Sequence, residues 1–179
     1  MSRALLPRFR FAPLGPALLL AALLAGCVES AEPILTGAQP ILGSQPRLQL
    51  YTLRDGAARE PASTTLAWRD GRYVRIDGDD TGIEDLTFHG FEGADLLVQS
   101  IRAKQPTEYA IARKLADGTY LVFAIDEGDA DERTRSRICG SDLRVNCRVT
   151  TREELLSLAR ATAARPRSTG ALAVLLAAQ

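Results

Sequence analysis

Two Asp-Gly pairs, each lying between strand-like runs, constrain the fold of this chain more than any other feature. Asp70-Gly71 separates residues 64–69 from 72–76, and Asp117-Gly118 separates residues 108–115 from 119–125. Asp-Gly favours the positive φ angles of a type I′ turn, whose twist matches that of two antiparallel strands. Both segments are therefore predicted to be β-hairpins of an antiparallel sheet.

Further strand-like runs follow one another from residue 47 onward. Residues 48–53 alternate in polarity, and residues 86–88 and 95–100 are short runs separated by glycines. Residues 120–125 are apolar on both faces, which is typical of a covered central strand. We expect an α+β protein, mainly antiparallel β, with about six to eight strands in a sandwich or small barrel.

One helix is predicted near the C-terminus, over about residues 151–164. Thr151 and Glu154 have the spacing of a capping box, and apolar residues follow at helical intervals. Pro166 ends the pattern, and the helix is expected to cover the sheet. The apolar tail, residues 171–178, is too short to span a bilayer. It is expected to be a last strand or helix on the core, or a loose end.

The N-terminal segment has the parts of a secretory signal. Arg3, Arg8 and Arg10 precede a nine-residue apolar run, residues 17–25, and the segment before Cys27 has no acidic residue. Nine residues rise only about 14 Å as a helix, roughly half the hydrocarbon thickness of a bilayer. A basic flank, a short apolar run and small residues before a possible cleavage point predict export.

The residues Leu24-Ala25-Gly26-Cys27 resemble the lipobox of bacterial lipoproteins. The resemblance covers only this N-terminal part. It implies a diacylglyceryl group on the sulfur of Cys27, cleavage before that residue, and acylation of the new amino group. The alternative is an ordinary secretory signal with a chance cysteine. Position 28 is Val rather than Asp, which in enteric bacteria favours the outer membrane, facing the periplasm, over the inner membrane.

The predicted organisation has three parts: a signal peptide over residues 1–26, a lipidated cysteine with a flexible tether over 27–46, and one β-rich domain over 47–179. Cleavage would remove 26 of the 179 residues and three of the 22 basic ones, leaving 153 residues with 19 basic and 22 acidic side chains. A chain without a basic excess is not expected to bind nucleic acid. The expected partners are the membrane, through the lipid anchor, and another envelope protein.

Cys139 and Cys147 are the two cysteines that remain once Cys27 is lipidated. An even pair in an oxidising compartment predicts a disulfide. A zinc site would need four ligands, and neither a histidine nor a third cysteine lies nearby in the sequence. A catalytic redox pair would normally be spaced more closely, as C-x-x-C.

Other residues give weak functional signals. His89, the single histidine, could serve as a general base, but the sequence shows no partner motif and a structural role is favoured. The carboxylates Asp126, Asp129 and Asp131 could converge on Ca²⁺, although a solvated turn is favoured because the loop lacks the EF-hand pattern. Aromatic residues on the strands could line a pocket or fill the core. We expect no cofactor and assign no catalytic residue.

Three classes of function follow from these signals. The first is a non-catalytic structural or interaction lipoprotein of the outer membrane. The second is a periplasmic β-barrel module that binds an apolar ligand or a peptide, or inhibits a lytic enzyme. The third is a hydrolase that uses His89, which would require a carboxylate or nucleophile beside the imidazole. The first class is expected, because no active-site motif is present and the tether suits an anchored module.

Overall fold

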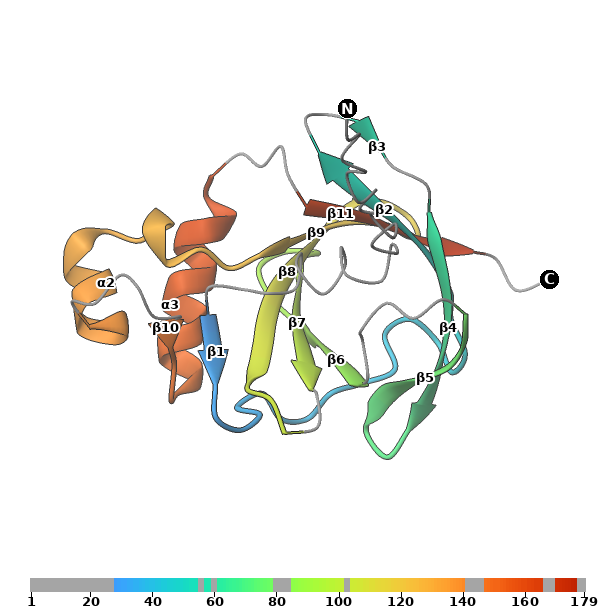
Figure 1. The fold of residues 1–179 in the computed structure, drawn as a ribbon, viewed down its shortest axis with the longest axis horizontal. Helices are drawn as coiled ribbons and strands as arrows, with labels where there is room; N and C mark the ends of the chain where they lie inside the picture. Colours follow the sequence, from blue (N-terminus) through green and yellow to red (C-terminus); the bar gives the residue numbers. More distant parts are fainter. Residues whose placement is uncertain are drawn as a thin grey trace, which may run out of the picture.

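A closed barrel of eight antiparallel strands forms the centre of the molecule in the computed structural model (Figure 1). The structure describes residues 28–54, 57–58, 61–78, 85–101, 104–140, 147–165 and 170–176. The barrel strands are β2 (Arg47–Arg54), β4 (Ala62–Arg69), β5 (Arg72–Gly78), β6 (Asp85–Gly90), β7 (Leu96–Ile101), β8 (Thr107–Ala116), β9 (Thr119–Ala124) and β11 (Gly170–Leu176).

These strands are joined in chain order, so the barrel is an up-and-down meander. β11 closes it by pairing with β2 on one side and β9 on the other, as shown by Ala173, which lies opposite both Leu50 and Tyr120. The fold is therefore α+β, mainly antiparallel β, as predicted, and the barrel is the correct choice over the sandwich. The apolar tail provides the last barrel strand.

Both Asp-Gly pairs form the predicted hairpins. At the first, Asp70 and Gly71 have φ angles of 50° and 79°, as a type I′ turn requires. At the second, Gly118 has a φ of 69°, and a register shift lies between Lys114 and Ala116. The second hairpin thus reaches the same strand pairing through a bulge.

The barrel interior is filled by inward-facing side chains from every wall. Trp68 and Phe88 contact Tyr73 edge-on, with ring centroids 4.9 and 5.6 Å from that of Tyr73. The buried members of this inner cluster are Leu48, Leu50, Leu66, Tyr73, Leu86, Phe88, Leu96, Val98, Ala110, Ala112 and Ala173. An eight-stranded barrel has an interior that side chains can fill, and here they form one of the two cores.

The second core lies outside the barrel, beneath helix α3 (Arg152–Ala163). Leu155, Leu158 and Ala159 are fully buried in this cluster, which also includes Ile111 of β8 and Phe123 of β9. The predicted capping box is present, because the Thr151 side chain accepts from the Glu154 backbone and the Glu154 side chain accepts from the Thr151 backbone. The helix therefore covers the sheet as expected.

Five smaller elements complete the described fold, and all but β3 lie near this helix (Figure 1). They are β1 (Val28–Ser30), β3 (Ala57–Ala58), η1 (Glu127–Asp129), α2 (Glu132–Cys139) and β10 (Cys147–Arg148). β3 pairs with β2, while β1 pairs antiparallel with the start of β8 and parallel with β10. Helix α2 was not predicted: its residues follow an acidic run, and the part of it that the structure describes buries no side chain fully. An amphipathic apolar stripe, the usual signal, is therefore missing.

Residues 28–46, expected to be a flexible tether, lie along the barrel instead. We call them the N-terminal strap. Val28 and Leu35 are 0% and 5% exposed, and Leu42 packs against the inner cluster. The backbone N–H groups of Leu42 and Trp68 donate to Tyr73 Oη and Ser44 O, respectively. The polar, Pro-containing composition of the strap did not indicate these few apolar contacts.

Candidate functional site

The edge of the sheet at β1 is where the predicted lipid anchor would meet the fold. Cys27 and residues 1–26 lie outside the described residues, but the next residue, Val28, is fully buried at the start of β1. Val28 pairs with Cys147, and Glu29 pairs with Glu108. The chain that follows position 27 is thus an integral part of the sheet.

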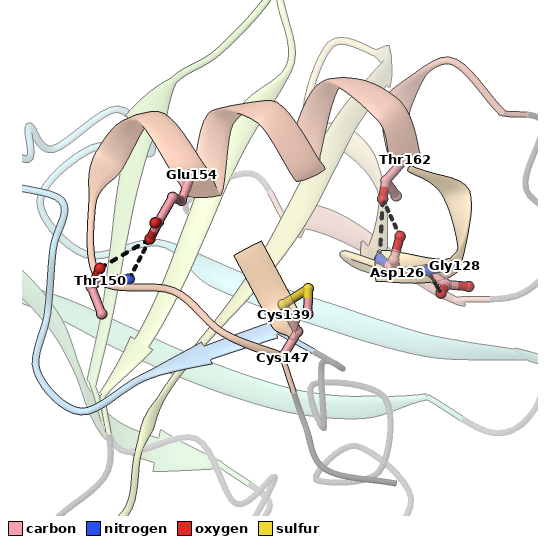
Figure 2. Close-up of a disulfide and its surroundings, with 7 residues drawn as sticks. All are labelled: Asp126, Gly128, Cys139, Cys147, Thr150, Glu154 and Thr162. Atoms are coloured by element: carbon pink, nitrogen blue, oxygen red, sulfur yellow. Dashed lines mark hydrogen bonds between the residues drawn. A yellow bond between two sulfur atoms is a disulfide. The ribbon is translucent and has the colours of Figure 1, made fainter. Parts of the chain in front are cut away.

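The predicted disulfide joins Cys139 to Cys147 beside this edge (Figure 2). It connects the last residue of α2 to the first residue of β10, with the two Cα atoms 4.6 Å apart. Because Cys147 lies opposite Val28, the disulfide ties α2 to the strand pair that contains β1. An ion pair of 3.1 Å from Arg148 to Glu29 lies across the same two strands.

Polar contacts lie at both ends of helix α3 (Figure 2). At its start, the N–H and hydroxyl of Thr150 donate to Glu154 Oε2 at 2.8 and 3.0 Å. The backbone N–H of Thr150 is the main reason that the pKa of Glu154 is lowered. At its end, Thr162 donates to the backbone carbonyl of Asp126 and accepts from the Asp126 N–H. The first contact caps the helix locally, and the second ties its end to the segment that follows β9.

A buried polar clamp holds the strap against the outer face of β7 and β8. Gln99 accepts from the N–H of Leu35 at 3.0 Å and donates to the carbonyl of Leu35 at 3.3 Å and to Thr87 Oγ1 at 3.0 Å. Tyr109 shares a hydrogen bond of 2.6 Å with the hydroxyl of Ser30. Gln99 and Tyr109 are each 1% exposed. Burial also raises the pKa of Tyr109, which keeps its hydroxyl protonated.

Sequence reasoning missed this clamp. The available signal was a single amide, Gln99, in a run of otherwise apolar residues that the pattern placed on a strand. A buried amide must find hydrogen-bond partners, so its presence in such a strand indicates a polar segment packed against it. Its partner, Leu35, lies 64 positions away in the sequence, where no local pattern could identify it.

His89 lies at the margin of the same clamp. Its Nε2 is 2.9 Å from Thr87 Oγ1, and it also has a hydrogen bond with the backbone of Thr36. Burial is the main cause that lowers the pKa of His89, and the positive charge of Arg152 lowers it further. These described contacts place a neutral imidazole between the barrel and the strap, and neither is with a carboxylate. They offer no support for the hydrolase hypothesis.

The three candidate Ca²⁺ ligands do not share a site in the part of the chain that the structure describes. Asp126 accepts from the N–H of Gly128 and caps η1, and Asp131 accepts from the N–H of Thr134 and caps α2. Asp129 lies within η1. Among the described residues, no three histidine, cysteine or acidic side chains are grouped as metal ligands. Two of the three carboxylates thus cap helices.

Six of the seven strand aromatic residues that were considered for a pocket lie in or against the two cores; Tyr51 belongs to neither cluster, and its hydroxyl donates to Gln49 Oε1 at 2.9 Å. Trp68, Tyr73, Phe88 and Tyr120 belong to or pack against the inner cluster, whereas Tyr109, like Phe123, belongs to the outer cluster. Tyr73 also reaches the strap, because its hydroxyl donates to the carbonyl of Gly43 at 2.9 Å. The inner aromatic residues therefore help to hold strap residues 42–43 against the barrel.

Comparisons with known proteins add no function to this geometry. No known protein family, no curated protein and no solved structure matches the chain. In the described part of the chain, no helix has the length and apolar character needed to cross a membrane. The structure defines a class by its fold: a closed, up-and-down antiparallel barrel with a covering helix. A disulfide lies at the edge where β1 pairs with β10.

Proposed function

We propose that this chain is an envelope lipoprotein, anchored through Cys27 in the outer membrane, whose barrel is a non-catalytic interaction module facing the periplasm. The observation that carries the proposal is the position of Val28, which is buried in β1 directly after the predicted lipidation site. Cleavage before Cys27 would keep all of β1 in the mature chain, with the lipidated residue directly before a buried strand residue.

The anchor is tested by expression in a Gram-negative host with radiolabelled palmitate. We expect label in the wild-type chain and its recovery with outer-membrane fractions, and we expect both to be lost in Cys27→Ala. The matched control is the double variant Cys139→Ala and Cys147→Ala, which should still be labelled. Label that persists in Cys27→Ala would overturn the proposed anchor.

The interaction role is tested by chemical crosslinking in intact cells, followed by purification of the wild-type lipoprotein. One envelope protein should be recovered with it reproducibly, and less of that protein should be recovered with Cys27→Ala, which is not held at the membrane. Recovery of no envelope protein at any crosslinker concentration would contradict the interaction role.

A second candidate is binding of an apolar ligand inside the barrel. Closed eight-stranded barrels can enclose one small ligand in other proteins, but here side chains of the inner cluster fill the interior, so a ligand would have to displace them. Trp68 is the single tryptophan and packs against the inner cluster, so its fluorescence reports on the interior. A saturable change on addition of palmitate would support this candidate, whereas an unchanged spectrum would remove palmitate as a ligand.

A further inference from the structure

We propose that one end of the molecule rests directly on the membrane, with a phospholipid surface that contains anionic headgroups as its partner. This end, which we call the anchor edge, consists of β1, α2 and β10 (Val28–Ser30, Glu132–Cys139 and Cys147–Arg148). The inference rests on the proposed function, because it needs acyl chains on Cys27. It goes further by assigning the orientation of the barrel and the surface that contacts lipid.

The first step is the distance between the anchor and the fold. Consecutive Cα atoms are about 3.8 Å apart, so a lipidated Cys27 lies within one residue of buried Val28. A domain of this size has a radius of gyration of about 15 Å. A connection so much shorter than the domain leaves no room for the barrel to rotate freely above the bilayer. The start of β1 must therefore lie at the headgroup region.

The second step is the rigidity of this attachment. β1 has a hydrogen-bonded neighbour on each side, because it pairs with β8 and with β10. The N–H of Val149 donates to the carbonyl of Glu29 at 2.8 Å, and the Cys139–Cys147 disulfide holds β10 to α2. The strap after β1 is fixed by Gln99 at Leu35. The residues nearest the anchor are thus tied to the barrel by several independent contacts.

The third step is the charge of the anchor edge. Helix α2 carries Arg133, Arg135 and Arg137 against two acidic residues, Glu132 and the N-cap Asp131, whereas α3 carries two basic and two acidic residues. Arg133 and Arg137 are exposed, and because they are four residues apart they lie on the same face of the helix. Arginine side chains beside a lipid anchor are attracted to anionic headgroups, so α2 suits the membrane surface.

Figure 1 shows the consequence for orientation. α2, β10 and β1 gather at one end of the molecule, and the β4–β5 hairpin lies at the other. A membrane at the anchor edge therefore leaves that hairpin far from the lipid. Ser136 on α2 and Arg69 at the end of β4 are both exposed, so they provide matched positions for a probe.

The test uses the full lipidated protein in vesicles of phosphatidylethanolamine and phosphatidylglycerol, with a fluorescent unnatural amino acid at Ser136 or Arg69. Lipids that carry a nitroxide on the headgroup quench a probe close to the surface. We expect quenching at Ser136 to be several-fold stronger than at Arg69. We also expect the Ser136 signal to weaken when a flexible Gly-Ser linker is inserted between Cys27 and Val28.

Charge reversal tests the lipid contact separately. The double variant Arg133→Glu and Arg137→Glu should reduce quenching at Ser136 in these vesicles and leave it unchanged in phosphatidylcholine vesicles. Equal quenching at Ser136 and Arg69 in a protein whose lipidation is verified by mass would overturn this inference alone. A protein without lipid on Cys27 would instead overturn the proposed function on which the inference rests.

Discussion

Replacing Gln99 by alanine should release the strap from the barrel. The substitution removes three hydrogen bonds, two of them to the backbone of Leu35. Leu35 is only 5% exposed, so its N–H and carbonyl would remain buried without their present partners. Each buried polar group left without a partner costs about 1–3 kcal/mol.

The expected loss in the free energy of unfolding is therefore about 2–4 kcal/mol. This is the lower part of the range summed over the N–H and carbonyl of Leu35, because water can enter the space left by the side chain. With a typical urea slope of about 1–3 kcal/mol per molar, the denaturation midpoint should fall by roughly 1–2 M. The matched control is Gln49→Ala. Gln49 is a partly exposed glutamine on β2 that accepts from Tyr51 Oη, and its loss should cost less than about 1 kcal/mol.

Urea denaturation and amide hydrogen exchange together check this prediction. In Gln99→Ala, the amide of Leu35 should exchange far faster than in the wild type, while the amides of the inner barrel strands keep most of their protection. A variant with the wild-type midpoint and unchanged exchange at Leu35 would refute the conclusion that Gln99 clamps the strap.

Three further predictions concern the surroundings of the clamp. Burial lowers the pKa of His89 below its ordinary value of about 6.5, so on acidification the unfolded chain binds the proton before the folded chain does. The contribution of His89 to the free energy of unfolding should therefore be complete above about pH 6.5 and fall as the pH drops toward the folded-state pKa. Denaturation midpoints should be measured between about pH 7 and about pH 5, a range that lies above most carboxyl pKa values. They should show this pH dependence in the wild type and much less of it in His89→Gln. Replacing Cys139 and Cys147 by serine should cost about 2.5 kcal/mol for a loop of eight residues, and equal midpoints with and without the disulfide would contradict this. Thr151→Ala should lower the free energy of unfolding by about 1 kcal/mol through loss of the helix cap, and a thermal midpoint identical to that of the wild type would argue against the cap's contribution.

The elements with local signals could be predicted from the sequence. Asp70-Gly71 defines a turn through the φ angles of two residues, and the reciprocal bonds of Thr151 and Glu154 define a helix start within one turn. The fold class followed from such signals. The closure of the barrel could not be predicted, because it depends on β11, whose apolar residues suit a strand or a helix equally well. Only pairing with Leu50 and Tyr120, far away in the sequence, decides between them.

The candidate site was predicted only in part for the same reason. Two cysteines in a chain that carries a predicted export signal predicted the disulfide, which requires no knowledge of the fold. The strap was expected to be a tether because its composition is polar and rich in proline and glycine. Its attachment depends on few contacts, of which the bonds from Gln99 to Leu35 are the clearest, and these join residues 64 positions apart. The composition of a segment describes its average polarity and cannot show such isolated contacts.

The most direct measurement is the mass of the mature protein extracted from envelopes, together with that of its N-terminal peptide. A chain that begins at Cys27 and carries a diacylglyceryl group on sulfur and an acyl group on its amino terminus is the predicted result. Lipid would then be attached one residue before a buried strand. A mature chain that begins at another residue, or an unmodified Cys27, would contradict an anchor placed directly against the barrel.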